Sequence, residues 1–196
     1  MTVDFDDFGA NHIISNECQS HDCRDKLDAL HYVNNNFKVT LFAIPGEMTP
    51  ELLDWCKANN GWVELAVHGL FHRDNWECAQ MSEEEFHAKI SRFGFIQDYF
   101  VKGFKAPGWQ ISDGIYSWLE KSGWWVADQS YNNERRPKGM RAYVNNNGVF
   151  TSGETIIDAW HGHTWDCVGN GIYETYDHVA GLIKDVEEFK FVSEVV

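Results

Sequence analysis

The chain has 196 residues, a formal net charge of −14 and 43% hydrophobic residues, which fits one globular domain. So acidic a chain argues against the basic face by which proteins bind nucleic acid or an anionic membrane. No run of 18 apolar residues occurs, so we expect no membrane span. Because no repeat, low-complexity tract or linker interrupts the sequence, we predict a single domain over residues 1–196.

Strands and helices alternate along the first half of the chain. The apolar run VTLFAI at 39–44 predicts a buried strand, which the turn signal Pro45-Gly46 ends. Thr49-Pro50 starts a helix, because proline is tolerated in the first helical turn, and Gly61 lies just beyond the end of that helix. The other elements predicted in this half are a strand at 2–5, a helix at about 23–35 that Asp22 caps, and a strand at 62–67.

The alternation continues to the C-terminus. Ser82 and Glu85 form a capping box for one helix, and Ser112 and Gly123 bound another. The asparagine-rich stretch 129–153 predicts long loops around a candidate strand at 141–144. The remaining predicted elements are helices at 82–93, 112–122 and 173–188 and strands at 103–105, 124–127, 155–160 and 189–192. This order implies a parallel sheet, either open or closed as a barrel.

Ionisable and aromatic residues follow one predicted strand after another. In parallel sheets, functional groups gather at the carboxyl ends of the strands. The residues at these ends are Asp6, Asp7, His68, His72, Lys105, Pro107, Trp109, Asp128, His161 and His163. Agreement across several strands indicates a catalytic or binding site more strongly than any single motif does.

Two histidines and an aspartate form the candidate metal site. The four-residue spacing of His68 and His72 puts both imidazoles on one face if this segment is helical. Asp7 would complete a set of two histidines and one carboxylate with positions left open for water. Zinc is the default ion for such ligands, and cobalt, nickel and iron(II) are alternatives.

The adjacent aspartates divide into two roles. Neighbours on a strand point in opposite directions, but at the end of a strand the chain can turn and bring both toward a site. Asp7 would then bind the metal while Asp6 accepts a proton from water. We assign Asp4, the third acid of this segment, to a structural or supporting role.

These motifs together resemble the polysaccharide deacetylase family, the NodB-homology domains of carbohydrate esterase family 4. The matching segments, in order, are FDDFG at 5–9, ELAVHGLFH at 64–72, FKAPGW at 104–109 and WHGHTW at 160–165. The resemblance covers nearly the whole chain and implies a distorted (β/α)7 barrel. It makes Asp6 the general base, Asp7, His68 and His72 the metal ligands, and Pro107 and Trp109 part of the pocket wall.

The sequence departs from the family pattern at four places. Gly69 replaces a serine or threonine, and Lys105 stands where an arginine usually orients the base; a lysine supplies charge but no planar fork. Phe8 comes between the aspartates and Gly9. We take Asp128 as the candidate partner of Lys105. The last motif offers both His161 and His163 as general acid, with a slight preference for His163 because it lies further beyond the strand.

The implied activity is metal-dependent hydrolysis of an N-acetyl group on an amino sugar or glycan. Trp109 and Trp165 are candidates for stacking on a sugar ring. Two alternatives remain open: a hydrolase of another non-peptide C–N bond, including cyclic amides, and a carbohydrate-binding domain with little catalytic rate. Gly69 and Lys105 favour the binding domain.

The cysteines and the N-terminus bear on location. Cys18, Cys23, Cys56, Cys78 and Cys167 are scattered without a CxxC pair, which favours a reducing compartment over a disulfide framework. The first residues, MTVDFDDFG, lack the basic region and apolar core of a signal peptide. We therefore expect a cytoplasmic protein.

Overall fold

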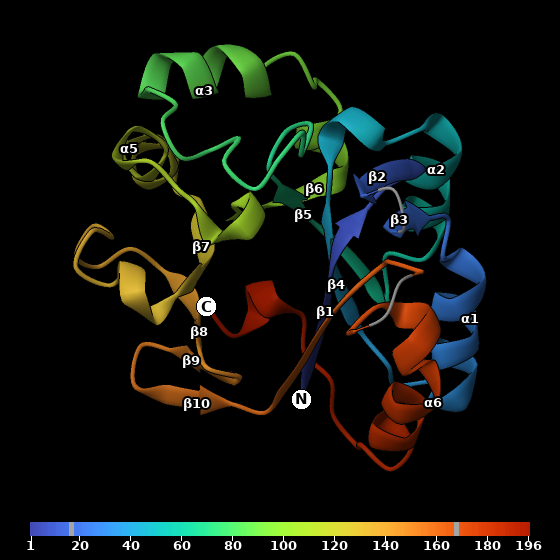
Figure 1. The fold of residues 1–196 in the computed structure, drawn as a ribbon. Coiled ribbons are helices and arrows are strands. Elements are labelled where there is room, and N and C mark those ends of the chain that lie inside the picture. The colour runs from blue at the N-terminus through green and yellow to red at the C-terminus, as the bar shows by residue number, and fades with distance from the viewer. Residues whose placement is uncertain (16–17, 167–168) are drawn as a thin grey trace.

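A computed structural model of the chain describes residues 1–15, 18–166 and 169–196, and the side chains of these residues except 11–21. Its main sheet curves into a nearly closed barrel with helices on the outside (Figure 1). Within the described residues this sheet has nine strands in the order β10-β9-β8-β7-β6-β5-β4-β1-β11. From β8 to β11 all neighbours in that order are parallel, which makes seven parallel strands. This confirms the predicted distorted (β/α)7 barrel.

The strands of the main sheet are β1 (Thr2–Phe8), β4 (Val39–Ala43), β5 (Val63–His68), β6 (Phe100–Lys105), β7 (Trp125–Gln129), β8 (Ala142–Asn146), β9 (Val149–Ser152), β10 (Thr155–Ile157) and β11 (Ala159–His163). β2 (Asn11–Ser15) and β3 (Cys18–His21) form a separate antiparallel hairpin directly after β1. β9 pairs antiparallel with both β8 and β10.

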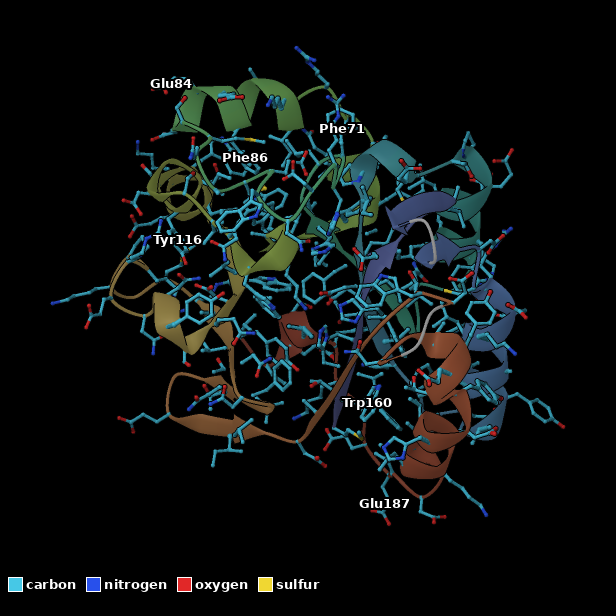
Figure 2. The ribbon with its side chains drawn as sticks, viewed as in Figure 1. Phe71, Glu84, Phe86, Tyr116, Trp160 and Glu187 are labelled. Atoms are coloured by element: carbon cyan, nitrogen blue, oxygen red, sulfur yellow. The ribbon has the colours of Figure 1, made fainter. Side chains whose placement is uncertain are left out.

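The helices are α1 (Arg24–Val33), α2 (Pro50–Ala58), α3 (Glu83–Ile90), α4 (Ile96–Tyr99), α5 (Asp113–Ser122) and α6 (Ile172–Ile183). Three predicted caps form: Thr49, Ser82 and Ser112 each accept a backbone N–H in the first turn of their helix. Asp22 is not the cap of α1, which begins after Cys23, although its carboxylate accepts the Arg24 N–H. On α3, Phe86 is buried toward the sheet while Glu84 points outward (Figure 2). In the described part of the chain, no helix is both long and apolar enough to cross a lipid bilayer.

Side chains alternate along the parallel strands between the helices outside and the barrel interior. Val3 and Phe5 of β1 pack in the outer core with α1 and α6. A second outer core lies under α3 and α5. The interior cluster is smaller and consists of Phe42, Ala66, Trp125, Ala127, Tyr143, Phe150 and Val192. Because Asp4 and Asp6 alternate with Val3 and Phe5, they face this interior.

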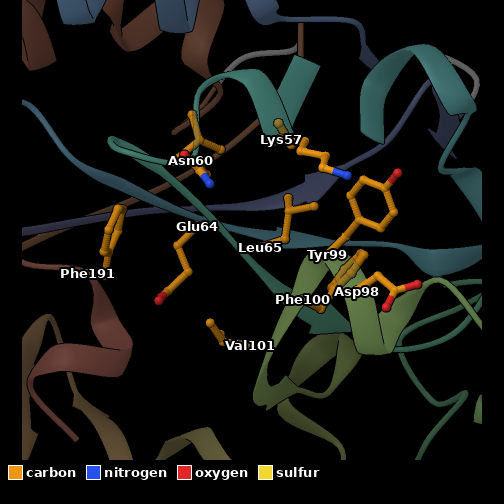
Figure 3. A pocket seen from close by; sticks show the side chains of 11 residues that line it. Lys57, Asn60, Glu64, Leu65, Asp98, Tyr99, Phe100, Val101 and Phe191 are labelled. Carbon is orange, nitrogen blue, oxygen red and sulfur yellow. The ribbon is translucent and has the colours of Figure 1, made fainter. Parts of the chain in front are cut away.

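The C-terminal turn, Val192–Glu194, lies inside the ring of strands (Figure 1). Val192 is fully buried in the interior cluster, and its N–H donates to Thr40 Oγ1. A pocket of about 360 Å³ lies beside this turn, between Phe191 and the amino ends of β5 and β6 (Figure 3). The C-terminal turn therefore fills one end of the barrel and leaves the carboxyl ends of the strands for the candidate site.

Several predicted elements need correction. Residues 189–192 are not a strand; they lead into the buried C-terminal turn, and their apolar side chains reflect burial rather than strand pairing. The helix predicted to end near residue 188 ends at Ile183, and the strand predicted at 155–160 is two strands, β10 and β11. The candidate strand at 141–144 is confirmed as β8, but the stretch after it, predicted as loop, holds β9, which forms a hairpin with β8. Cys23, Cys56 and Cys78 are buried free thiols, whereas the side chains of Cys18 and Cys167 lie outside the described residues.

Candidate active site

Asp7 reaches the site because the backbone turns at the end of β1. On a regular strand Asp7 would point away from Asp6, toward the outer core. Asp7 instead has φ 64°, and the pairing of β1 with β4 shifts register between Phe5 and Phe8. Thr164 holds this turn, since its hydroxyl donates to the Asp7 carbonyl and its N–H donates to the Asp6 carbonyl. The two neighbouring carboxylates therefore lie at one end of the barrel.

Asp7, His68 and His72 bring three donor atoms together. Asp7 Oδ1 lies 3.2 Å from Nε2 of each histidine. Tetrahedral zinc with bonds of 2.0–2.1 Å needs ligand atoms about 3.3 Å apart, so this spacing suits a small divalent cation. His68 Nδ1 lies 3.2 Å from the Lys105 carbonyl, which leaves Nε2 as the nitrogen with a lone pair toward Asp7. One carboxylate oxygen and two imidazole nitrogens are a donor set that fits zinc, cobalt, nickel or iron(II).

The loop that carries His72 is not helical, which corrects our assumption about the four-residue spacing. β5 ends at His68, and the chain then turns with φ 57° at Gly69 and φ 47° at His72. A Cβ atom on residue 69 would lie 2.7 Å from Pro107 Cγ, so glycine is required at this position. The histidines converge because the loop folds back on itself.

Glu77 holds this loop and is a residue that sequence analysis missed. Its carboxylate accepts the backbone N–H groups of Leu70, Phe71 and His72, at 3.2, 3.0 and 2.8 Å. Three N–H groups aimed at one carboxylate stabilise the left-handed backbone of His72. A Cβ atom at position 69 would lie 2.8 Å from Glu77 Oε2, so the Glu77 carboxylate occupies the space that the side chain of a serine or threonine would take.

Asp6 is buried against a lysine. Lys105 Nζ lies 2.7 Å from Asp6 Oδ1, and only 1% of the Lys105 side chain is exposed. Burial by itself would raise the pKa of Asp6, but the positive charge of Lys105, helped by His161, His68 and His163, lowers it to about 2. Asp6 is therefore an ionised acceptor with its second oxygen, Oδ2, turned toward the histidines of β11.

His161 and His163 both face Asp6. Their Nε2 atoms lie 3.8 and 4.0 Å from Asp6 Oδ2. Their Nδ1 atoms have different partners: Asp4 Oδ2 lies 2.7 Å from His161, and Asn170 Oδ1 lies 2.9 Å from His163. Burial lowers the pKa of His163 to about 4, although the charge of Asp6 opposes this. The two histidines thus share one carboxylate but differ in the group behind them.

No family model matches the sequence, and no curated protein matches it. Solved structures do match, at low sequence identity. A family 4 acetyl xylan esterase from Clostridium thermocellum, solved with a cobalt ion, is 16% identical, with a TM-score of 0.60 over 98% of this chain and 88% of that chain. The Bc1960 peptidoglycan N-acetylglucosamine deacetylase is 14% identical, with a TM-score of 0.58 over 99% and 86% of the two chains. BA3943, a pseudoenzyme of the same family from Bacillus anthracis, is 12% identical, with a TM-score of 0.54 over 99% and 64%.

The chain has the carbohydrate esterase family 4 fold. At these identities the likeness concerns the fold, and it confirms at that level the resemblance that the ordered motifs carry.

Within this family 4 fold, the predicted aromatic residues lie beside the site but have different surroundings. Trp109 is half-buried, with its ring 4.2 Å from Lys105 Nζ and 6.1 Å from the His161 ring. Pro107 is buried against the loop after β5. Trp165 stacks on His163 at 3.8 Å, and its Nε1–H donates to Asp7 Oδ2 at 2.7 Å. One face of Trp165 is therefore occupied by His163, and the indole N–H orients Asp7.

Asp128 does not lie beside Lys105. It accepts hydrogen bonds from Tyr116, Asn132 and Arg136, at 2.5, 2.8 and 3.1 Å. The ionisable groups that contact Lys105 are Asp6, Asp4 and His161. In this family 4 fold Asp128 thus joins β7 to α5 and to the loop after η3 (Ser130–Asn132), and the pairing we predicted does not form.

Proposed function

We propose that the protein is a metal-dependent hydrolase that removes N-acetyl groups from an amino sugar or glycan. The observation that carries this proposal is the convergence of Asp7, His68 and His72 beside an independent carboxylate, Asp6. A metal ligand set next to a carboxylate that is not itself a ligand, and next to a histidine, is what hydrolysis of an amide by water requires. The neighbours with this fold include enzymes whose names describe removal of acetyl groups from polysaccharides.

Each residue has a proposed role. Asp7, His68 and His72 would hold a divalent cation, zinc by preference, which supplies a Lewis acid and a lowered pKa for bound water. Asp6 takes a proton from the attacking water through Oδ2, since Oδ1 is bonded to Lys105. His161 or His163 gives a proton to the leaving amine. Trp109 forms a wall of the pocket and offers a ring face to a sugar.

A carbohydrate-binding domain with little catalytic rate is the second candidate. The 2.7 Å ion pair with Lys105 favours it, because a carboxylate with a pKa near 2 is a weak base. The pseudoenzyme BA3943 is a neighbour with the same fold. A hydrolase of other C–N bonds would use the same groups on a different substrate.

One experiment separates these candidates. Purified protein is analysed for bound divalent metal. It is assayed for amine and acetate release from N-acetylated chitooligosaccharides and peptidoglycan fragments, for acetate release alone from O-acetylated xylan, and for opening of small cyclic amides. Stoichiometric metal with acetate release from an N-acetylated glycan supports the deacetylase. Ring opening alone would favour the cyclic-amide hydrolase, and saturable glycan binding without turnover would favour the binding domain.

A further inference from the structure

Asp4 is a buried carboxylate that the proposed roles above do not use. It lies on β1, three residues before Asp7, and is fully buried inside the barrel. In the parallel pairing of β1 with β11, Asp4 is opposite His161 and Asp6 is opposite His163. The same register therefore places one carboxylate behind His161 and the other in front of it.

The contacts of Asp4 fix its two oxygens separately. Oδ2 lies 2.7 Å from His161 Nδ1 and 3.6 Å from Lys105 Nζ. Oδ1 accepts from the Tyr143 hydroxyl at 3.4 Å, and that hydroxyl lies 3.0 Å from Thr2 Oγ1. These contacts fix the orientation of the Asp4 carboxylate. With Nδ1–H bonded to Asp4, Nε2 of His161 is directed at the space in front of Asp6.

His163 has no such support from a carboxylate in the described structure. The atom behind its Nδ1 is the amide oxygen of Asn170, and its ring is covered on one side by Trp165. An amide oxygen fixes a tautomer but adds no negative charge to stabilise an imidazolium. The two histidines are therefore unequal as proton donors.

We propose that Asp4 is the positioning residue for His161, and that His161 is the histidine that protonates the leaving amine. This inference rests on the proposed function, and it goes further by choosing between the two histidines. As the amide C–N bond breaks, the nitrogen takes the Nε2 proton of the His161 imidazolium, and the electron pair of that N–H bond stays on Nε2. The second imidazole proton stays on Nδ1 throughout and is hydrogen-bonded to Asp4. Asp4 lowers the free energy of the imidazolium without touching the substrate.

Other groups around His161 are compatible with this role. The ring is walled by Trp109 and Phe150, each with its centroid 6.1 Å away. Lys105 lies 3.5 Å from Nδ1, and its charge is balanced by Asp6 and Asp4. Asp6, His161 and His163 also have the donor atoms for a second metal ion, but the ammonium group 2.7 Å from Asp6 would repel a second cation there.

A matched pair of variants tests the inference. Asp4→Asn keeps the shape behind His161 and removes the charge, whereas Asn170→Ala removes the group behind His163. We expect Asp4→Asn to lower kcat about 10- to 100-fold with KM little changed. The loss of kcat in Asn170→Ala should be several-fold smaller than the loss in Asp4→Asn. The reverse order of losses, or a loss confined to KM, would overturn the assignment to His161.

A spectroscopic readout does not depend on turnover. In zinc-loaded protein with ¹⁵N-labelled histidine, His161 should show a proton on Nδ1 with a downfield resonance typical of a bond to carboxylate. Asp4→Asn should move that resonance upfield, and Asn170→Ala should leave it in place. A proton on Nε2 alone in neutral His161, or binding of two zinc ions per chain that His161→Ala reduces to one, overturns the inference. If no substrate is turned over while the resonance behaves as expected, the proposed function fails and the Asp4–His161 pairing stands.

Discussion

At the carboxyl ends of the strands Asp6 is buried against a lysine, whereas at the amino ends Glu64 is buried against two hydroxyl groups. Asp6 is 4% exposed and Glu64 is 7% exposed, so burial is similar. The Asp6 partner is the Lys105 ammonium group. The Glu64 partners are the Thr40 hydroxyl, at 2.9 Å, and the hydroxyl and N–H of Ser193.

The difference in partners shifts the two pKa values in opposite directions. Burial raises the pKa of Glu64, and the bonds from Ser193 and Thr40 only partly oppose this. The pKa of Asp6 falls to about 2 because positive charges outweigh its burial. Neutral hydrogen-bond donors are sufficient for Glu64, whose carboxyl group bonds the C-terminal turn to the interior of the barrel. A cation accompanies the buried carboxylate that faces the candidate site, and this contrast distinguishes the two ends of the barrel.

Asp6→Asn should have the largest effect on function. It keeps the shape of the side chain but removes the proton acceptor, so we expect acetate release to fall about 10²- to 10⁴-fold. The Asp7, His68 and His72 ligand set is untouched, so the metal content should stay the same. Asp177→Asn, on the exposed face of α6, is the matched control. Turnover retained in Asp6→Asn would contradict the role of Asp6 as base.

Glu77→Gln tests whether the metal ligands depend on the loop after β5. The amide would direct an NH₂ group toward the backbone N–H groups that the carboxylate now accepts, so the His72 backbone should relax. We expect metal affinity to fall about 10- to 100-fold, measured by competition with a chelating dye. Glu84→Gln, exposed on α3, is the control. Equal metal affinity in both variants would show that the loop needs no such support.

The metal ligands and the base are predicted from short sequence motifs, in which the residues lie close together along the chain. FDDFG and HGLFH name Asp6, Asp7, His68 and His72, because the aspartates are adjacent and the histidines are four positions apart, each pair at the end of a strand. The roles of Glu77 and Asp4 depend on how loops fold back and on strand register. Asp4 and His161 are 157 residues apart and meet only because β1 pairs with β11 in one register. No periodicity in the sequence carries that information.

The barrel itself follows from the alternation of strands and helices, but its closure does not. Residues 189–192 carry the apolar alternation of a strand, and a strand was the wrong interpretation. Val192 is buried by insertion into the barrel, with no sheet partner among the described residues. Burial of this kind and burial in a sheet select the same residue types, so the pattern cannot separate them.

Val192→Ala probes the structural end of the barrel. The substitution removes two buried methyl groups from the interior cluster, so we expect the free energy of unfolding to fall by about 2 kcal/mol. Urea denaturation measures this change. Val149→Ala, at a valine that is 47% exposed, should cost less. Metal affinity should change little, since Val192 lies at the opposite end from the ligands. Equal losses of stability in the two variants would mean that the C-terminal turn does not fill the barrel.

Glu64→Gln should have the smallest effect, and its sign depends on pH. The folded protein binds the Glu64 proton more tightly than the unfolded chain does, because the pKa is raised on folding. This contribution to stability is present below the unfolded pKa of about 4.3 and is lost as the pH rises through the folded pKa. Glutamine does not titrate, and its amide can still bond Thr40 and Ser193.

We therefore expect Glu64→Gln to be more stable than the wild type at pH 8, with a free energy of unfolding in urea higher by about 1 kcal/mol or less. This advantage should be lost near pH 4. Glu187→Gln, at an exposed position (Figure 2), should show no such crossing. A variant less stable than the wild type at pH 8 would mean that Glu64 is buried in its ionised form, as Asp6 is, and the contrast between the two ends of the barrel would disappear.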